Sequence, residues 1–110
     1  MFSTPDLSDK NDDARVIEVS FNHYGNVKSF CGQIETAVCP DDNSYVKEIL
    51  EEDGKNRLLF VDGSMSMKCA LLGDMLAAKA IDNNWSGIVI NGCVRDVEVL
   101  SSLSIGIMAI

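Results

Sequence analysis

The sequence predicts an α/β domain with a mainly parallel central sheet. Two segments, RLLFVDG and SGIVINGC, are near-continuous apolar runs, which is typical of parallel strands buried on both faces. Helical patterns lie between and after them, so that strand and helix alternate from residue 57 to the end of the chain. Such alternation favours parallel strands joined by right-handed crossovers. The predicted elements are strand 57–63, helix 70–84, strand 86–93, helix 95–103 and a strand within 104–110.

The first part of the chain predicts two strands and a turn. RVIEVSF (15–21) alternates enough to form a strand, and NHYGN (22–26) has the composition of a turn. SFCGQIETAVC (29–39) is a second strand, interrupted at Gly32 by a bulge or a close approach of another backbone segment.

A helix is predicted within residues 40–55, because its start and stop signals are both present. Asp42 or Asn43 caps the start and Gly54 ends it. The apolar side chains within it recur at helical spacing and predict the buried face: Val46, Ile49 and Leu50.

Composition indicates one small globular domain and excludes several classes of partner. The chain has 110 residues, of which 46% are hydrophobic, and a net charge of -8. That charge argues against nucleic acid, whose phosphates require Lys and Arg, and against an anionic membrane surface. No apolar run is long enough to cross a bilayer. A small anionic substrate stays possible where an arginine, a metal or backbone amides offset the charge.

The cysteine pattern predicts a cytoplasmic protein. The four cysteines are widely spaced and form no Cys-x-x-Cys pair, so neither a zinc knuckle nor a redox motif is indicated. Free thiols, most of them buried, in a reducing compartment are the simplest interpretation.

Two acidic motifs flank one helix–strand unit. Asp74 follows Gly73 near the start of the predicted helix, and twenty residues separate it from the pair Arg95–Asp96. Ligands of parallel α/β sheets gather at the carboxyl ends of the strands, where the loops lead into helices. If strands 57–63 and 86–93 are neighbours, both motifs meet at one sheet edge.

This set of residues suits a small keto acid. Backbone N–H groups of residues 73–76 can bind a carboxylate near a helix start, and Arg95 offers a planar, permanently charged fork. Asp96 can ligate Mg²⁺ or Mn²⁺, which needs few protein ligands and polarises a carbonyl group. The alternative is structural: a solvated aspartate beside a tight contact, and a helix cap with a surface ion pair.

The sequence also resembles a known family, the one named for the regulator of ribonuclease activity A (RraA). This family includes the class II 4-hydroxy-4-methyl-2-oxoglutarate aldolases. The resemblance runs from about Thr4 to Ile110, and its most specific element, an acid, twenty residues, then Arg-Asp, marks the aldolase branch. It rests on TPDLSD, SFCGQIETAVCPDDNSYVKEIL, LLFVDG, ALLGDMLAAKAIDNNWSGIVINGCVRDVEVL and LSIGIMAI.

The resemblance implies a swivelling-domain-like (β/β/α) fold that assembles as a homotrimer, with active sites at subunit boundaries and a divalent cation, Mg²⁺ or Mn²⁺. Arg95 would bind substrate and stabilise an enolate, Asp96 would hold the metal, and Asp74 would orient a water that accepts or returns a proton. The substrate-binding turn would consist of Gly73, Asp74, Met75 and Leu76.

The reaction implied is aldol cleavage of a 4-hydroxy-2-oxo diacid to pyruvate and a second oxo acid, with oxaloacetate decarboxylation as a second activity. The chain stops at Ile110 within an apolar run, whereas the family's domain continues. We therefore expect residues 1–110 to be a single incomplete domain that lacks C-terminal strands. Two alternatives stay open: a non-catalytic inhibitor that binds a ribonuclease, and an inactive truncated aldolase.

Overall fold

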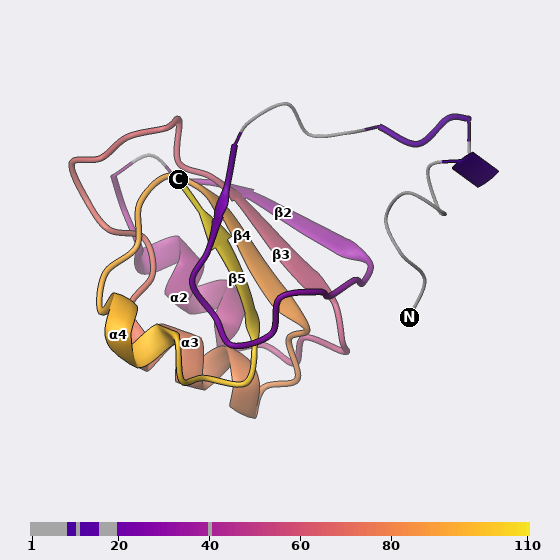
Figure 1. Cartoon of the computed structure of the whole chain (residues 1–110). Coiled ribbons are helices and arrows are strands. Elements are labelled where there is room, and N and C mark those ends of the chain that lie inside the picture. Colours follow the sequence, from indigo (N-terminus) through magenta and orange to yellow (C-terminus); the bar gives the residue numbers. More distant parts are fainter. Residues whose placement is uncertain (1–8, 11, 16–19, 40) are drawn as a thin grey trace.

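In the part of the chain that the structure describes, five strands form one sheet in the order β1-β5-β4-β3-β2. The computed structural model, drawn in Figure 1, describes residues 9–10, 12–15, 20–39 and 41–110. The strands are β1 (Asn22–His23), β2 (Ile34–Val38), β3 (Leu58–Asp62), β4 (Gly87–Asn91) and β5 (Gly106–Ala109).

Strands β2 to β5 are parallel neighbours, which confirms the predicted α/β class and its mainly parallel sheet. The register pairs the last residue of β3, Asp62, with the last residue of β4, Asn91. The carboxyl ends of these two strands therefore meet at one edge. Among the described strands, β1 alone runs antiparallel, beside β5, and the sequence did not predict it.

Among the described residues, the hydrophobic core lies between the sheet and the helices that cover one of its faces (Figure 1). The helices are α2 (Ser44–Leu50), α3 (Asp74–Asp82) and α4 (Val97–Leu100). Alternate strand residues point into this layer and are buried, as expected for side chains of opposite orientation along a strand. They are Ala37, Leu59, Val61, Ile88, Ile90, Ile107 and Ala109. Within the described ranges, no helix combines the length and apolar character that a bilayer crossing requires.

The opposite face of the sheet is covered in part by the segment that leads from β1 to β2. Phe30 lies over two strand glycines, Gly87 and Gly106, where an added Cβ would collide with its ring. Phe21 packs edge-on against Phe60 of β3, with ring centroids 6.4 Å apart. The two strand glycines thus leave room for the Phe30 ring, whereas Phe21, which directly precedes β1, packs against another aromatic side chain.

The first predicted elements differ from the observed ones. Of the predicted strand 15–21, residues 16–19 lie outside the described residues, and Ser20 and Phe21 are not in a strand. The predicted turn at 22–26 begins instead with β1, because Asn22 and His23 pair with Ala109 and Met108. The predicted strand 29–39 is limited to Ile34–Val38. Gly32 does make a close backbone approach, to the carbonyl oxygen of Asn56.

Helix α2 confirms the predicted buried face, since Val46, Ile49 and Leu50 are buried. Asn43 is its N-cap by position but makes no side-chain cap hydrogen bond. Asp42 instead accepts hydrogen bonds from the backbone N–H and the hydroxyl of Ser44, at 2.9 and 2.8 Å.

The predicted ends of three helices were wrong. Helix α4 spans Val97–Leu100 and not 95–103. Helix α2 stops at Leu50, before Gly54, which packs against Trp85. Helix α3 begins at Asp74 and not at residue 70. The residues before it are extended because Leu72 forms a parallel bridge with Val94.

Candidate active site

The two loops that carry the predicted site residues run side by side. The backbone N–H of Leu71 donates to the carbonyl oxygen of Cys93 at 3.0 Å. The backbone N–H of Arg95 donates to the carbonyl oxygen of Leu72, also at 3.0 Å. With the Leu72–Val94 bridge between them, these bonds form a short parallel ladder beyond the ends of β3 and β4. The ladder brings residues 73–74 next to residues 95–96.

The structure confirms that Asp74, Arg95 and Asp96 converge. The backbone N–H of Asp74 donates to Oδ2 of Asp96 at 3.3 Å. The same oxygen lies 3.8 Å from Nε of Arg95, and the side chains of Arg95 and Asp96 are 69% and 40% exposed. An ion pair that is this long and this exposed contributes little to stability. Both charged groups therefore stay available to a ligand.

Gly73 permits this close approach. A Cβ at position 73 would lie 2.8 Å from Oδ2 of Asp96 and 3.0 Å from Nε of Arg95. The backbone of Gly73 is extended, with φ at -134°, so any residue could adopt its conformation. The requirement for glycine here is one of space and not of backbone flexibility.

Asp96 serves as a cap for a helix that lies far from it in sequence. Gly73 is the N-cap residue of α3 and has no side chain to accept a hydrogen bond. The first N–H groups of a helix have no partner within the helix, and the Asp96 carboxylate satisfies that of Asp74. The following amides, of Met75 and Leu76, belong to the same first turn and suit a bound carboxylate.

Asp96 itself has a left-handed backbone conformation, with φ at 59°. Among residues with a Cβ, aspartate and asparagine tolerate this region best. The turn aims the chain from the ladder into α4, for which Asp96 is the N-cap. Its backbone geometry thus serves one helix while its carboxylate serves another.

A second polar pair, which the sequence analysis missed, ties the loop after β3 to the end of β4. Oδ1 of Asp62 accepts hydrogen bonds from the Ser64 N–H at 2.9 Å and from Nδ2 of Asn91 at 3.2 Å. The carbonyl oxygen of Asn91 accepts from Gly63 and Met65, both at 3.0 Å. The sequence did contain a signal for this pair, because each of the two buried strands ends on a polar residue.

The donor set fits a cation held by few protein ligands. In the part of the chain that the structure describes, no group of three or more His, Cys, Asp and Glu residues could hold a metal. Asp96 offers one hard carboxylate oxygen beside Asp74, in an open position. Mg²⁺ commonly binds through one or two carboxylates and keeps several waters, so this arrangement suits it.

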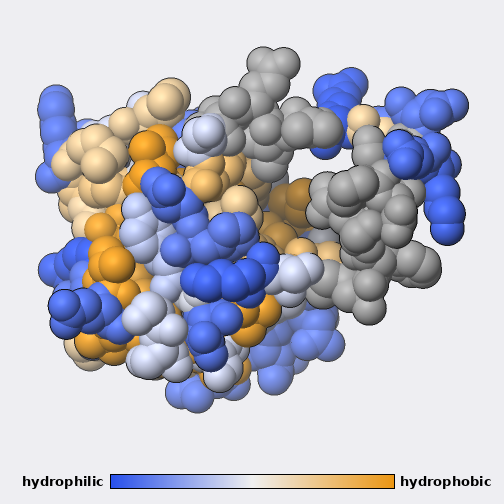
Figure 2. Space-filling view, viewed as in Figure 1, coloured by the Kyte–Doolittle hydropathy of each residue, from blue (hydrophilic) through white to orange (hydrophobic). Residues whose placement is uncertain are grey.

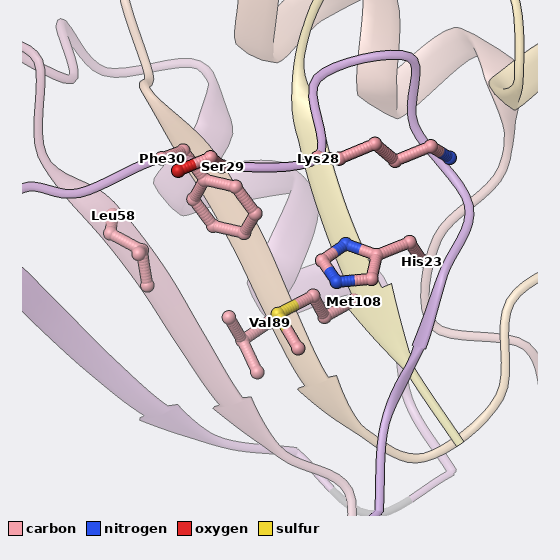
Figure 3. A pocket seen from close by; sticks show the side chains of 7 residues that line it. All are labelled: His23, Lys28, Ser29, Phe30, Leu58, Val89 and Met108. Carbon is pink, nitrogen blue, oxygen red and sulfur yellow. The ribbon is translucent and has the colours of Figure 1, made fainter. Parts of the chain in front are cut away.

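A separate hollow lies on the face of the sheet away from the helices. It has a volume of about 280 Å³, and it shares no residue with the candidate active site. Figure 3 shows Phe30 and His23 lying over the strands while the Lys28 side chain points away from the hollow. Its lining consists of His23, Lys28, Ser29, Phe30, Leu58, Val89 and Met108.

The cysteine thiols have no assigned role in the site. Four free thiols are present, and the expectation that most of them are buried was wrong: Cys39 is buried, Cys31 is exposed, and Cys69 and Cys93 are intermediate. Burial raises the pKa of the Cys39 thiol, and the negative charge of Asp42 raises it further. A thiol held in its neutral form is a poor nucleophile, so Cys39 acts as a core residue.

Curated relatives cover nearly the whole chain. A protein of Pseudomonas putida (strain W619) named "Putative 4-hydroxy-4-methyl-2-oxoglutarate aldolase" is 54% identical over 99% of this chain and 68% of its own length. Proteins with the same name from Pseudomonas syringae pv. tomato and Pseudomonas aeruginosa (strain PAO1) are 49% and 47% identical over the same shares.

Two solved structures share the fold. One, from Geobacillus kaustophilus, is named as an S-adenosylmethionine:2-dimethylmenaquinone methyltransferase. It has a TM-score of 0.95 and 40% identity over 99% of this chain and 68% of its own. The other is the RNA-processing inhibitor RraA of Thermus thermophilus, with a TM-score of 0.94 and 39% identity over 99% and 66%. These matches agree with the swivelling-domain-like fold expected from the sequence.

These relatives are named for different functions. What they share is therefore a family and not an activity. The family model RraA-like, described as Aldolase/RraA, matches residues 4–110. This chain therefore belongs to the RraA-like family.

Proposed function

We propose that this chain is a divalent-metal-dependent aldolase. Its substrate would be 4-hydroxy-4-methyl-2-oxoglutarate or a related 4-hydroxy-2-oxo diacid, which it cleaves to pyruvate and a second oxo acid. Oxaloacetate decarboxylation would be its second activity. The observation that carries the proposal is the convergence of the Asp74 amide, Arg95 and Asp96 at the carboxyl edge of the sheet.

Each residue has a role that its position supports. The first-turn amides of α3 bind the substrate carboxylate, next to Gly73, which leaves room for it. The Arg95 guanidinium binds the 2-oxo group and stabilises the negative charge that develops there. Asp74 orients a water, which accepts the proton of the 4-hydroxyl group as the carbon–carbon bond breaks. The same water returns a proton to the enolate, which gives pyruvate.

The cation would be Mg²⁺ or Mn²⁺, held by Asp96. When bound, it acts as a Lewis acid on the oxo acid and so lowers the energy of the enolate. The free thiols suit the cytoplasm, which we propose as the location of the reaction.

We further propose that the chain works as a homotrimer. Several large apolar side chains are exposed around the candidate active site, and such surfaces are typical of interfaces. Figure 2 shows apolar side chains gathered over the loop that follows β3. The exposed residues are Met65 and Met67 in the loop after β3, Met75 in the first turn of α3 and Val97 at the start of α4. Light scattering of the purified chain tests the assembly, and a folded monomer would contradict it.

The activity is tested by pyruvate release from oxaloacetate, with and without Mg²⁺. Reactions without protein at the same Mg²⁺ concentration correct for spontaneous decarboxylation. Asp96→Asn is expected to abolish the response to metal, and Arg95→Ala to lower turnover about 100- to 1,000-fold. Asp82→Asn, an exposed carboxylate at the far end of α3, is the matched control and should keep full activity.

A second readout separates metal binding from catalysis. Binding of Mn²⁺, followed by electron paramagnetic resonance, should be lost in Asp96→Asn and kept in Arg95→Ala. A folded chain that releases no pyruvate in either condition would refute the catalytic proposal. In that case the inhibitor role named for the Thermus thermophilus structure would become the better one.

A further inference from the structure

Strand β2 leaves one side of its backbone unpaired. It is the last strand of the sheet, and its partner is β3. The carbonyl oxygen of Gln33 accepts from the N–H of Leu58, and the N–H of Cys39 donates to the carbonyl oxygen of Asp62. The odd-numbered residues of β2 therefore direct their backbone N–H and C=O groups toward β3. Residues 34, 36 and 38 therefore direct their N–H and C=O groups outward. No strand in the described part of the chain pairs with that side.

Among the described residues, this edge has little of the usual protection against strand addition. Natural edges are blunted by lysine, proline, bulges or a covering segment. Strand β2 contains neither lysine nor proline, and its one charged side chain, Glu35, is paired with Arg57. Its residues pair with β3 in unbroken register. Two of its apolar residues, Ile34 and Val38, are 61% and 69% exposed. The strand offers hydrogen-bonding groups and apolar contacts together.

An acidic groove runs beside this edge, between β2 and α2. Its volume is about 280 Å³, and its lining is Glu35, Tyr45, Glu48, Ile49 and Glu52. Arg57 pairs with Glu35 at 2.7 Å. Among the described ion pairs none involves Glu48 or Glu52. The groove therefore combines negative charge with an aromatic and an aliphatic side chain.

We infer that β2 and this groove bind an extended, basic segment of a partner protein, which adds to the sheet as a further strand. Successive side chains of a strand point to opposite faces. Lysines or arginines on one side of the segment would reach Glu48 and Glu52, while apolar residues on the other side would cover Ile34 and Val38. Backbone hydrogen bonds to β2 supply affinity, and the charges select the segment. This surface lies outside the candidate active site.

A second copy of the chain suits this edge less well. Pairing β2 with its own copy would bring two acidic grooves together, and like charges across an interface are unfavourable. A basic partner meets no such repulsion.

The test uses a short peptide of alternating lysine and valine, titrated into the isotope-labelled chain. We expect amide chemical shifts to change, and hydrogen exchange to slow, at Ile34, Thr36 and Val38. Affinity should fall as salt is added. A peptide of the same charge, methylated on alternate backbone nitrogens, should bind at least about tenfold more weakly, because it cannot form the ladder.

Two charge reversals test the groove. Glu48→Lys should weaken binding about tenfold, whereas Asp82→Lys, which changes the net charge equally but lies on α3, should change it less than about twofold. Equal effects of the two variants would overturn the proposal, as would equal binding of the methylated peptide or shift changes confined to other surfaces. A free chain that is already a dimer with protected β2 amides would overturn it in favour of a second copy.

Discussion

Gly73 is the residue on which the geometry of the candidate active site depends most directly. A methyl group at this position would displace the ends of Arg95 and Asp96, which are flexible side chains and not backbone. The fold can tolerate that displacement more easily than the reaction can, because misplacing a reacting group by about 1 Å can lower a rate about 100-fold.

We therefore predict that Gly73→Ala lowers pyruvate release from oxaloacetate about 10- to 100-fold and leaves the free energy of unfolding nearly unchanged. Steady-state kinetics and urea denaturation measure the two effects. Gly92→Ala is the matched control, since a Cβ there would meet Leu71 and Ile90 only at ordinary contact distances of 3.4 and 3.5 Å. Full activity of Gly73→Ala would contradict the assigned geometry.

For individual residues, the sequence predicted which site residues lie together. It did not predict all the hydrogen bonds that hold the site loops in place. The convergence of Asp74 with Arg95 and Asp96 follows from parallel strands whose carboxyl ends share an edge. The hydrogen bond between Asp62 and Asn91 was not predicted, because it depends on the register of β3 against β4. Register is set by tertiary packing, which single-residue patterns do not report.

The segment between β1 and β2, which covers part of the sheet face opposite the helices, is packed onto the sheet through Phe30. Phe30 occupies the space that Gly106 and Gly87 leave free on adjacent strands. A side chain at either position would force the ring away from the sheet, and overpacking of this kind typically costs about 1–3 kcal/mol.

We predict that Gly106→Ala lowers the free energy of unfolding by about 1–3 kcal/mol, because its methyl group and the Phe30 ring cannot share the same space. In the Phe30→Ala background the same change should cost less, since the ring is absent. Urea denaturation of the four proteins of this double-mutant cycle gives the coupling. Additive effects would show that the two residues do not interact.

The elements best predicted from sequence are those that local pattern and packing both favour. Strands β3 and β4 are apolar runs buried in the middle of the sheet, and the start and buried face of α2 follow from local signals. Two errors arose where tertiary pairing overrides local preference. Leu71 and Leu72 have helical propensity but are held extended by the loop after β4. The polar residues of β1 form a strand only because β5 offers its edge.

For the whole molecule, surface carboxylates make stability depend on pH. Hydrogen bonds from Ser44 lower the pKa of Asp42, and the N–H of Lys55 lowers the pKa of Asp53. A hydrogen bond from Lys79 lowers the pKa of Glu51. The stabilisation from such groups is present above their unfolded pKa values, about 3.9 for Asp and 4.3 for Glu, and is lost as pH falls through the folded values.

We predict that Asp53→Asn destabilises the protein at pH 7 and that its difference from the unmodified chain shrinks as pH falls below about 4. The asparagine has no charge to lose, so the two proteins converge in acid. Free energies of unfolding from urea titrations at several pH values measure the difference. A gap that stays constant or widens in acid would contradict the prediction.

Fold class was accessible from the whole sequence because alternation of strand and helix leaves few topologies. The parallel order from β2 to β5 and the placement of three helices on one face follow that rule. The open face was harder to predict. Its contacts come from Phe21, just before β1, and from Phe30 in the segment between β1 and β2. The position of Phe30 depends on the strand glycines and not on a local pattern.

The double use of Asp96 has a consequence for how this fold can diverge. Replacing one carboxylate oxygen of Asp96 by an amide nitrogen would retain an acceptor for the helix and the tolerance for its unusual turn. The same exchange would remove the negative charge. A single substitution in a descendant could thus remove the catalytic activity and keep the fold. The stable protein would then be free to evolve a different function.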